Sequence, residues 1–234
     1  MVEGRVWGAL TAGASGAPLP AGSEHRLEIF AKLVATAIAN AQARASLAAL
    51  AGDRAALRRV AGLVARGAAA GDIFAAVATE ASQLLGDRAM TLVRFEAERE
   101  LVVVASCGGP ARVGERIRFE ADTLPDRVRR EDRVVRVDDY TRERDSSLAD
   151  SYGLAAAVAA PISVEGEVWG MLTATSSGAP LSAATEQRLQ PFSEMVAAAL
   201  ANSQARGELQ ALADEQSALR RIAELTSQER ASPA

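Results

Sequence analysis

The sequence predicts an α+β fold in which an antiparallel sheet of at least six strands carries helices at both ends. Three observations support this prediction. Six short apolar segments are separated by charged or Gly-Pro turns, amphipathic helices precede and follow them, and a long stretch of the chain occurs twice. Hydrophobic residues make up 49% of the 234 residues but aromatic residues only 4%, so Ala, Val and Leu have to fill the core.

The repeated stretch sets the domain organisation. Residues Val2–Leu63 recur at Val164–Leu225 without a gap, at a constant offset of 162 residues, and more than half of the positions are identical. A unit of that length is a compact domain rather than a solenoid repeat. We therefore expect residues 1–53 to be the C-terminal part of a preceding repeat (a hairpin strand and a long helix), residues 54–216 to be one complete domain, and residues 217–234 to be the first helix of a following repeat.

The complete unit is expected to open with two helices and four strands. Apolar residues at helical spacing predict one helix ending near Gly67 and a second over Ile73–Leu84, with Gly86 as its stop. The next segments are short and rich in β-branched and apolar residues. They predict strands at Met90–Phe95, Leu101–Cys107, Arg116–Phe119 and Val134–Val137.

The second half of the unit contains the two clearest strands. Before them, Asp122 is expected to cap a short helix over Thr123–Arg130. The polar stretch Asp138–Tyr152 predicts a loop with a helical turn. The strands are Ala155–Val164 and Val168–Ser176, and the pair Glu165-Gly166 between them is typical of a tight hairpin turn.

A long helix is expected from about Ala183, and its apolar stripe predicts a dimer. The 3-4 spacing shifts by one residue partway along, and the upstream copy shows the same shift. We expect nearly continuous helices between domains, with a bend or a local change of winding near Gly52 and Gly207. The stripe predicts a homodimer through the terminal helices, with contacts at Leu189, Phe192, Val196, Leu209, Leu212 and Leu219.

Four blocks follow one another along the chain: ALRRVAGLVARGAAAGDIFAAVATEASQLLG, RVVRVDDY, GLAAAVAAPISVEGEVWGMLTATSS and RLQPFSEMVAAALANSQAR. In this order they resemble the GAF domain family, in the variety found in tandem in actinobacterial sensor histidine kinases. The resemblance implies a GAF/PAS-like six-stranded antiparallel sheet flanked by helices, with long N- and C-terminal linker helices. The first and last helices would lie on one face of the sheet, often forming a dimer bundle.

The resemblance also implies a small-molecule pocket on the other face, covered by the segment Ile117–Gly153. A mostly apolar lining with two tyrosine hydroxyls would suit a small amphipathic ligand. The alternative is that these residues simply form a second core, and neither a ligand nor a cofactor is identified by them. The residues expected to flank the pocket are Phe95, Cys107, Phe119, Leu124, Val128, Tyr140, Tyr152 and Val158.

No catalytic or metal-binding constellation is evident in the sequence. The single histidine, His25, has Gln187 as its counterpart in the second copy, so a triad or a haem ligand is not expected from it. Cys107 has no flanking His or resolving Cys and is read as a small apolar residue. Asp138-Asp139 lacks a third ligand and fits a capping role better. We therefore expect a protein without enzymatic activity.

The charge and composition of the chain limit the kinds of partner that it is expected to bind. The net charge is −4, and the Arg-rich segment Arg127–Arg144 is interleaved with acids, which argues against a nucleic-acid surface. No apolar run reaches the ~18–20 residues of a membrane span, and no signal peptide is evident. Together with the single cysteine, these features predict a cytoplasmic protein.

The leading functional hypothesis is a regulatory or sensory module of a multidomain signalling protein, most of all a sensor histidine kinase whose output domain is outside this chain. Two alternatives remain open. One is a stand-alone small-molecule or redox sensor that uses the pocket or Cys107, and the other is a purely structural dimerisation spacer. In the leading hypothesis the helix around Leu47–Leu63 carries the signal, because its two apolar registers offer two states.

Overall fold

The computed structural model describes residues 6–16, 18–86, 88–143 and 147–206, and the chain divides into two compact units between Arg54 and Ala55. Helix α1 (Ser23–Arg66) spans this boundary with 44 residues and runs without interruption through Gly52. Gly207, the other expected bend, and the expected third segment 217–234 lie outside the described residues. The tandem arrangement of repeats stays a prediction.

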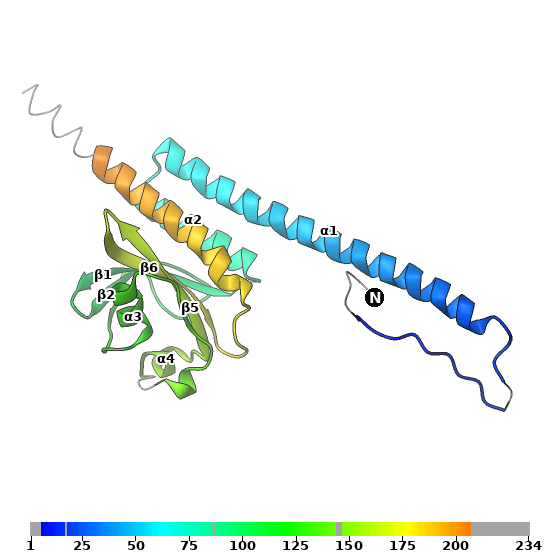
Figure 1. The fold of residues 1–234 in the computed structure, drawn as a ribbon. Helices are drawn as coiled ribbons and strands as arrows, with labels where there is room; N and C mark the ends of the chain where they lie inside the picture. The colour runs from blue at the N-terminus through cyan, green and yellow to red at the C-terminus, as the bar shows by residue number, and fades with distance from the viewer. Residues whose placement is uncertain (1–5, 17, 87, 144–146, 207–234) are drawn as a thin grey trace, which may run out of the picture. The chain divides into compact units, whose positions relative to one another are not determined.

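The second unit is a six-stranded antiparallel sheet with helices on both faces (Figure 1). The strand order is β3-β2-β1-β6-β5-β4, so the last strand of the chain lies near the middle of the sheet. This confirms the expected fold class. The elements are α2 (Ala70–Leu84), β1 (Ala89–Ala97), β2 (Glu100–Cys107), β3 (Arg116–Arg118), α3 (Leu124–Glu131), β4 (Val135–Val137), the 3₁₀ turn η1 (Tyr140–Arg142), α4 (Ser147–Tyr152), β5 (Ala156–Val164), β6 (Glu167–Ser176) and a helix over residues 184–206.

The β5–β6 hairpin has the turn that its sequence predicts. Val164 pairs with Glu167, which leaves Glu165 and Gly166 as a two-residue loop. Both loop residues have positive φ, 54° and 85°. Two left-handed residues in succession are what a type I′ turn requires, and this turn matches the right-handed twist of the strands. The hairpin places β6 beside β5, and β6 then pairs with β1 on its other side.

The main core lies between the sheet and the layer formed by α2, the end of α1 and the helix of residues 184–206. Three residues expected to contact a partner helix belong to this core. Leu189, Phe192 and Val196 are at most 2% exposed, because their stripe faces the sheet of the same domain. They are therefore unavailable for a dimer contact, which corrects that part of the sequence prediction. Leu209, Leu212 and Leu219 lie outside the described residues.

Arg136 of β4 connects the sheet to the loop and helix that follow β6. Its Nε donates to Glu186 Oε1 at 2.5 Å, and its Nη1 and Nη2 donate to the carbonyls of Leu181 and Ser182 at 2.9 and 2.8 Å. Nη1 also pairs with Asp138 at 2.8 Å. One guanidinium thus satisfies two loop carbonyls and two carboxylates, and it fixes the start of the last helix on the sheet.

The cap of α3 differs from the sequence prediction. Thr123, not Asp122, is the residue before the helix, and Pro125 lies in the first turn as expected. Asp122 instead has a positive φ of 61°, and its backbone N–H donates to Asp126 Oδ2 at 2.9 Å. Helix α3 therefore begins one residue later than predicted. Asp139 does cap η1, accepting from the Thr141 N–H at 3.0 Å.

The first unit contains no strand within its described residues. Residues 6–12, which repeat β6 in sequence, have an extended but unpaired backbone. Their large side chains are exposed, with Trp7 at 63% and Leu10 at 51%. The expected hairpin strand is not formed, because no neighbouring strand is available to pair with it in this unit.

Candidate functional site

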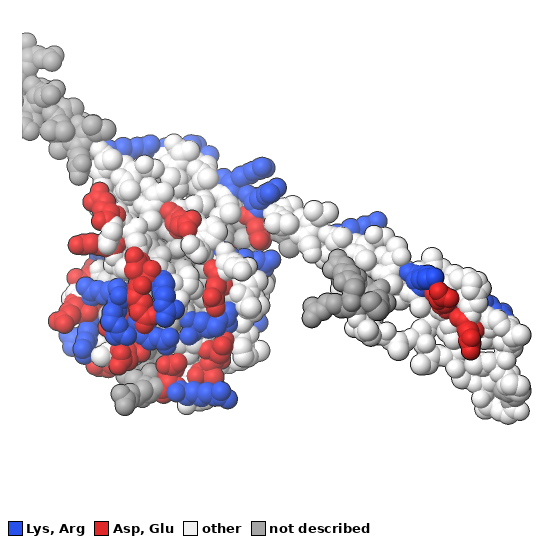
Figure 2. All heavy atoms as spheres, in the orientation of Figure 1, with Lys and Arg blue, Asp and Glu red and all other residues white. Residues whose placement is uncertain are grey.

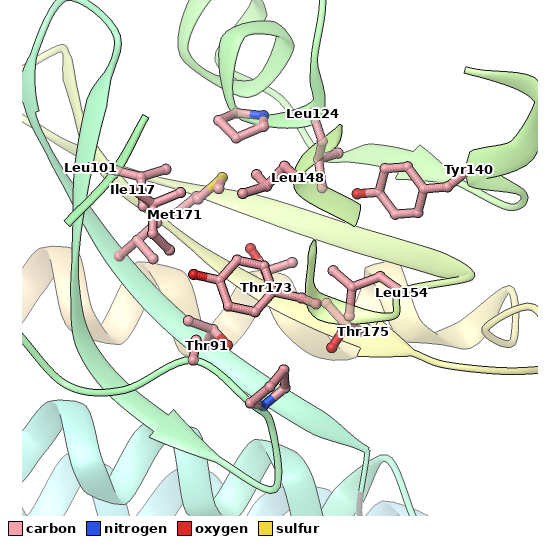
Figure 3. A pocket seen from close by; sticks show the side chains of 15 residues that line it. Thr91, Leu101, Ile117, Leu124, Tyr140, Leu148, Leu154, Met171, Thr173 and Thr175 are labelled. Carbon is pink, nitrogen blue, oxygen red and sulfur yellow. The ribbon is translucent and has the colours of Figure 1, made fainter. Parts of the chain in front are cut away.

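A cavity of about 80 Å³ lies on the face of the sheet opposite α2, beneath α3, η1 and α4 (Figure 3). Its floor comes from β1, β2 and β6, and its walls come from α3, α4 and the segments around β3. The segment Ile117–Gly153 therefore supplies much of the cover, as the sequence analysis expects. The lining residues are Thr91, Val93, Leu101, Pro110, Ala111, Ile117, Leu124, Pro125, Tyr140, Leu148, Tyr152, Leu154, Met171, Thr173 and Thr175.

Three threonines form the polar part of the floor. Thr91 of β1 lies directly opposite Thr173 of β6 in the antiparallel register, and Thr175 follows two residues along the same strand. Because side chains alternate between the faces of a strand, residues 173 and 175 share the cavity face, while Leu172 and Ala174 enter the main core. Figure 3 shows the three threonines close together along the floor.

The Thr173 hydroxyl is buried without a hydrogen-bond partner. The residue is 7% exposed, and its Oγ1 is inaccessible to solvent and has no hydrogen-bond partner among the described residues. The neighbouring Thr175 hydroxyl donates a long hydrogen bond of 3.4 Å to the Ala89 carbonyl. Buried hydroxyls in proteins are normally paired, so an unpaired one on a residue that lines a cavity calls for an explanation.

Tyr152 of α4 connects the cover of the cavity to the loop before β3. Its hydroxyl donates to Glu115 Oε1 at 2.6 Å, and the Arg112 N–H donates to the other carboxylate oxygen at 2.8 Å. The backbone hydrogen bond from Arg112 and the one from Tyr152 lower the pKa of Glu115. Partial burial and the carboxylate together raise the pKa of Tyr152 to about 12. Tyr152 is therefore a neutral donor, already engaged by Glu115.

Tyr140 points its hydroxyl end into the cavity, toward Leu148 (Figure 3). Its backbone N–H donates to the Ala155 carbonyl at 2.9 Å, which fixes η1 beside the start of β5. Burial of the ring raises the pKa of the Tyr140 hydroxyl well above its usual range, and the charge of Glu143 adds to this effect. The hydroxyl remains protonated at any physiological pH.

All lining side chains of this cavity are uncharged. The polar side chains of the lining are those of threonine and tyrosine, and the other lining residues are aliphatic, Pro or Met. A charged ligand would lose its hydration here without gaining an ion pair, which is strongly unfavourable. The arrangement can hold an uncharged molecule by apolar contact and by hydrogen bonds from threonine and tyrosine hydroxyls.

Six of the eight residues that sequence reasoning proposed for the pocket lie on the cavity side of the sheet. Leu124, Tyr140 and Tyr152 line the cavity itself. Three others form the packed cluster beside it, where the rings of Phe95 and Phe119 meet edge to face at 5.8 Å. Arg129 lies over the Phe95 ring at 5.4 Å. Val128, from the same helix α3, is fully buried in that cluster.

The remaining two proposed residues face the main core and do not line the cavity. Val158 lies between Ala157 and Ala159, which face the cavity side, so the proposal was one residue out of phase. Cys107 is an even number of residues from Leu101 and Val103, so it would share their face in a regular strand. A β-bulge between Val103 and Cys107 changes this. The register of β2 shifts between the pairs Val93↔Val103 and Leu92↔Ala105, and the residues after the shift turn to the helix side.

Sequence reasoning missed the threonine floor. Thr91, Thr173 and Thr175 occupy alternate positions in strands that otherwise read as apolar, and polar residues at such positions signal a functional or water-filled face. The apolar lining residues Met171 and Leu154 carry no such signal. Pro110 and Ala111 belong to a loop whose path depends on the β2–β3 pairing, which the local sequence does not determine.

The outer surface of the second unit alternates in charge. On the face shown in Figure 2, arginines and acidic residues are interleaved. Arg130, for example, pairs with Asp126 at 2.9 Å and with Asp122 at 3.2 Å. Among the described residues, no group of three or more His, Cys, Asp or Glu side chains could hold a metal ion, and no helix is long and apolar enough to cross a membrane.

Solved structures of similar fold include a chromophore-bound domain and a domain of a phosphotransferase. The phycoerythrobilin-bound GAF domain of a cyanobacterial phytochrome is 22% identical, with a TM-score of 0.58 over 66% of this chain and 97% of that one. The GAF domain of an Acinetobacter phosphoenolpyruvate-protein phosphotransferase is 15% identical, with a TM-score of 0.55 over 67% and 97%.

An enzyme also shares the fold. The free methionine-R-sulfoxide reductase of Neisseria meningitidis, solved with its substrate, is 20% identical, with a TM-score of 0.56 over 65% of this chain and 91% of that one. At these identities the likeness concerns the fold alone. None of the curated proteins compared with this chain is significantly similar to it. The GAF domain model matches residues 70–200, which is more than half of the sequence, and the chain therefore belongs to the GAF domain family.

Proposed function

We propose that the second unit is a sensory module that binds a small uncharged molecule in the cavity beneath α3 and α4. The observation that carries the proposal is the Thr173 hydroxyl, which is buried and unpaired on a residue that lines the cavity. A cavity of this size has room for water molecules in the absence of a ligand, and the threonine and tyrosine hydroxyls of the lining residues are the side-chain groups that would pair with them. A ligand that displaces them and pairs with Thr173 gains apolar contacts with Leu124 and Met171 that water does not make.

The cavity limits the size of the ligand. Its volume of about 80 Å³ is smaller than the ~150 Å³ of an engineered cavity that binds benzene. In the described conformation it therefore takes a compact molecule of about six non-hydrogen atoms at most. A larger ligand would have to displace α4, which the Tyr152–Glu115 hydrogen bond holds in place. The chemistry of the lining favours a compact apolar body with one amide, hydroxyl or heterocyclic nitrogen.

A matched pair of probes tests this ligand class. Isobutyramide and isobutyrate have almost the same shape, but only the second is charged at neutral pH. We expect millimolar isobutyramide to shift the amide resonances of Thr91, Thr173 and Thr175 in the full chain, and isobutyrate to leave them unchanged. Thr173→Val keeps the side-chain shape, removes the hydroxyl and should weaken isobutyramide binding by about fivefold or more, since a hydrogen bond contributes roughly 1 kcal/mol.

Two results would overturn the proposal for the cavity. One is equal binding of the two probes, which would show that charge is tolerated there. The other is a complete absence of probe-induced shifts at the three threonines in a folded chain. Ser151→Ala serves as the matched control, because it removes a hydroxyl that bonds within α4, to the Ser147 carbonyl at 2.8 Å, and should leave probe binding unchanged.

We further propose that the parent protein is a signalling protein of the sensor histidine kinase class and that α1 transmits the signal. The sequence blocks of the tandem GAF type support the first part, and the continuity of α1 supports the second. One residue inserted after Ala45 rotates the following helix by about 100°. In the parent protein this insertion should change kinase output strongly, whereas Glu28→Gln should not. Equal output from both variants would make α1 a passive spacer.

We also propose that the protein forms a homodimer through its terminal helices. Leu189, Phe192 and Val196 are occupied by the domain core, so the proposal rests on Leu209, Leu212 and Leu219 in the sequence. Light scattering should give a dimeric mass for the wild type and a monomeric mass for Leu212→Asp. A monomeric wild type at high concentration would contradict the proposal.

A further inference from the structure

The first unit exposes a row of large apolar side chains. Trp7 is 63% exposed, Leu10 is 51%, Phe30 is 59% and Val34 is 48% exposed. Leu10 and Val34 also line a groove of about 270 Å³ between the extended segment and α1. Contiguous apolar surface of this kind marks a face that another piece of protein covers.

The repeat identifies the kind of surface that this face fits. Each exposed residue has a counterpart 162 positions later whose surroundings are known from the complete domain. Those counterparts lie in its main core, between the sheet and the helices. Leu10, Phe30 and Val34 correspond to Leu172, Phe192 and Val196, which are 0%, 2% and 0% exposed.

A glycine at the equivalent position in each copy is a second, independent indication that a strand packs against the first unit. A Cβ atom on Gly170 would lie 2.2 Å from the Val93 carbonyl oxygen, because β6 passes very close to β1 at that point. Its counterpart Gly8 has nothing within 4 Å of the same position. The first unit therefore has a glycine suited to the close approach of a neighbouring strand, although no described strand pairs with it.

We propose that residues 6–44 are the sixth strand and terminal helix of a second GAF domain, and that their apolar face docks on a five-stranded GAF sheet carried by a preceding repeat. In the complete domain β6 pairs with β1 on one side and with β5 on the other. The occupant must therefore offer two strands with a vacant place between them. A second copy of this chain offers none, because its own β6 fills that place.

The occupant must also bring a helix equivalent to α2. In the complete domain Trp169 has the ring of Phe74 packed against it at 5.6 Å. Its counterpart Trp7 lines the open groove of the first unit. A helix lying on the docked sheet would fill this groove and cover Trp7.

A fragment of residues 55–164 is a suitable probe, since it contains α2 and β1–β5 but lacks β6. We expect the full chain to keep this fragment soluble on co-expression and to elute with it from a sizing column. Gly8→Val should reduce the captured amount by about tenfold or more, because the added side chain meets a strand carbonyl in the docked state. Glu28→Gln, on the exposed side of the same helix, should leave capture unchanged.

The Gly8→Val variant separates docking on the first unit from exchange with the second. Open space around Gly8 means that the variant should keep the circular dichroism and unfolding curve of the wild type. Capture that survives Gly8→Val would show that the fragment binds elsewhere, and would overturn the proposal. Failure of the wild-type chain to capture the fragment would overturn it as well. Self-association lost in Phe30→Asp but kept in Gly8→Val would make this face a helix dimer surface instead.

Discussion

The Tyr152 hydroxyl lies 2.6 Å from Glu115 Oε1, and this contact joins α4 to the loop before β3 beside the cavity that Tyr152 lines. The two residues are 37 positions apart in the sequence. Neither belongs to the sheet, so their hydrogen bond is a direct link between two segments that cover the pocket. A ligand larger than the cavity has to break it or move both segments together.

Loss of this link should loosen α4 locally. Tyr152→Phe removes the hydroxyl and keeps the ring, so hydrogen exchange of the amides in residues 149–154 should become faster. Global stability should fall by no more than about 1 kcal/mol, the usual contribution of one hydrogen bond. Exchange measured by mass spectrometry checks this, with Ser151→Ala as the control. Identical exchange in wild type and Tyr152→Phe would show that the contact does not hold α4.

Both tyrosines of the chain should resist ionisation in the folded state. A free tyrosine has a pKa of about 10, whereas that of Tyr152 is raised to about 12 and that of Tyr140 is raised further by burial. Raised values mean stability that is complete below pH 10 and is lost as pH rises through the folded pKa. At pH 10 the tyrosinate absorbance of the native chain should stay close to zero, and it should appear at once in urea. A half-ionised native spectrum at that pH would contradict the raised pKa of the two hydroxyls.

Acid should weaken the Tyr152–Glu115 hydrogen bond by protonating the Glu115 carboxylate. The pKa of Glu115 is lowered in the folded state, so its contribution is present above its usual value of about 4.3 and is lost as pH falls through the lower folded value. We expect exchange in α4 to rise below pH 4 in the wild type. In Glu115→Gln, which keeps an acceptor but does not titrate, this rise should be absent.

Removal of the unpaired hydroxyl should not harm the domain. Thr173→Val replaces a buried unsatisfied group with an isosteric apolar one, which is neutral or stabilising by up to about 1 kcal/mol. Urea unfolding checks this. A loss of more than about 1 kcal/mol would show that the hydroxyl has a partner in the folded protein, and the argument for a ligand at Thr173 would fail.

The two repeats offer a matched pair of core substitutions. Phe192→Ala should cost roughly 3–5 kcal/mol, because the ring is 2% exposed within the main core. Phe30→Ala, at the equivalent position but 59% exposed, should change the stability of this chain by less than about 0.5 kcal/mol. Urea unfolding followed by circular dichroism gives both values. Equal losses would mean that the first unit is packed in solution.

Arg136 should matter more than its charged neighbours. Arg136→Met removes charge-assisted hydrogen bonds to Glu186 and to two carbonyls, and should cost about 1–3 kcal/mol. Arg133→Met removes a side chain that is 64% exposed, and should cost less than about 0.5 kcal/mol. A comparison of the two unfolding midpoints checks the prediction. Equal midpoints would show that Arg136 does not anchor the last helix.

The sequence predicts the sheet well because each strand is a local pattern. Thus β5 and β6 are evident from their apolar runs and from Glu165-Gly166 between them. The cavity is predicted less completely, because it depends on which face each residue occupies. The bulge in β2 moves Cys107 to the other face, and no residue type marks that bulge. The helix stripe of Phe192 is correctly apolar, but its spacing alone does not tell a core from a dimer surface.

The central place of β6 also affects how the domain is made. The strand is synthesised last among the six, yet it joins β1 to β5. Until Glu167–Ser176 has left the ribosome, β1 and β5 each present an unpaired edge to the surroundings, as partly folded β-domains do. The nascent chain therefore depends on its final hairpin to close the sheet. A premature stop before residue 167 should yield an aggregating product rather than a smaller stable domain.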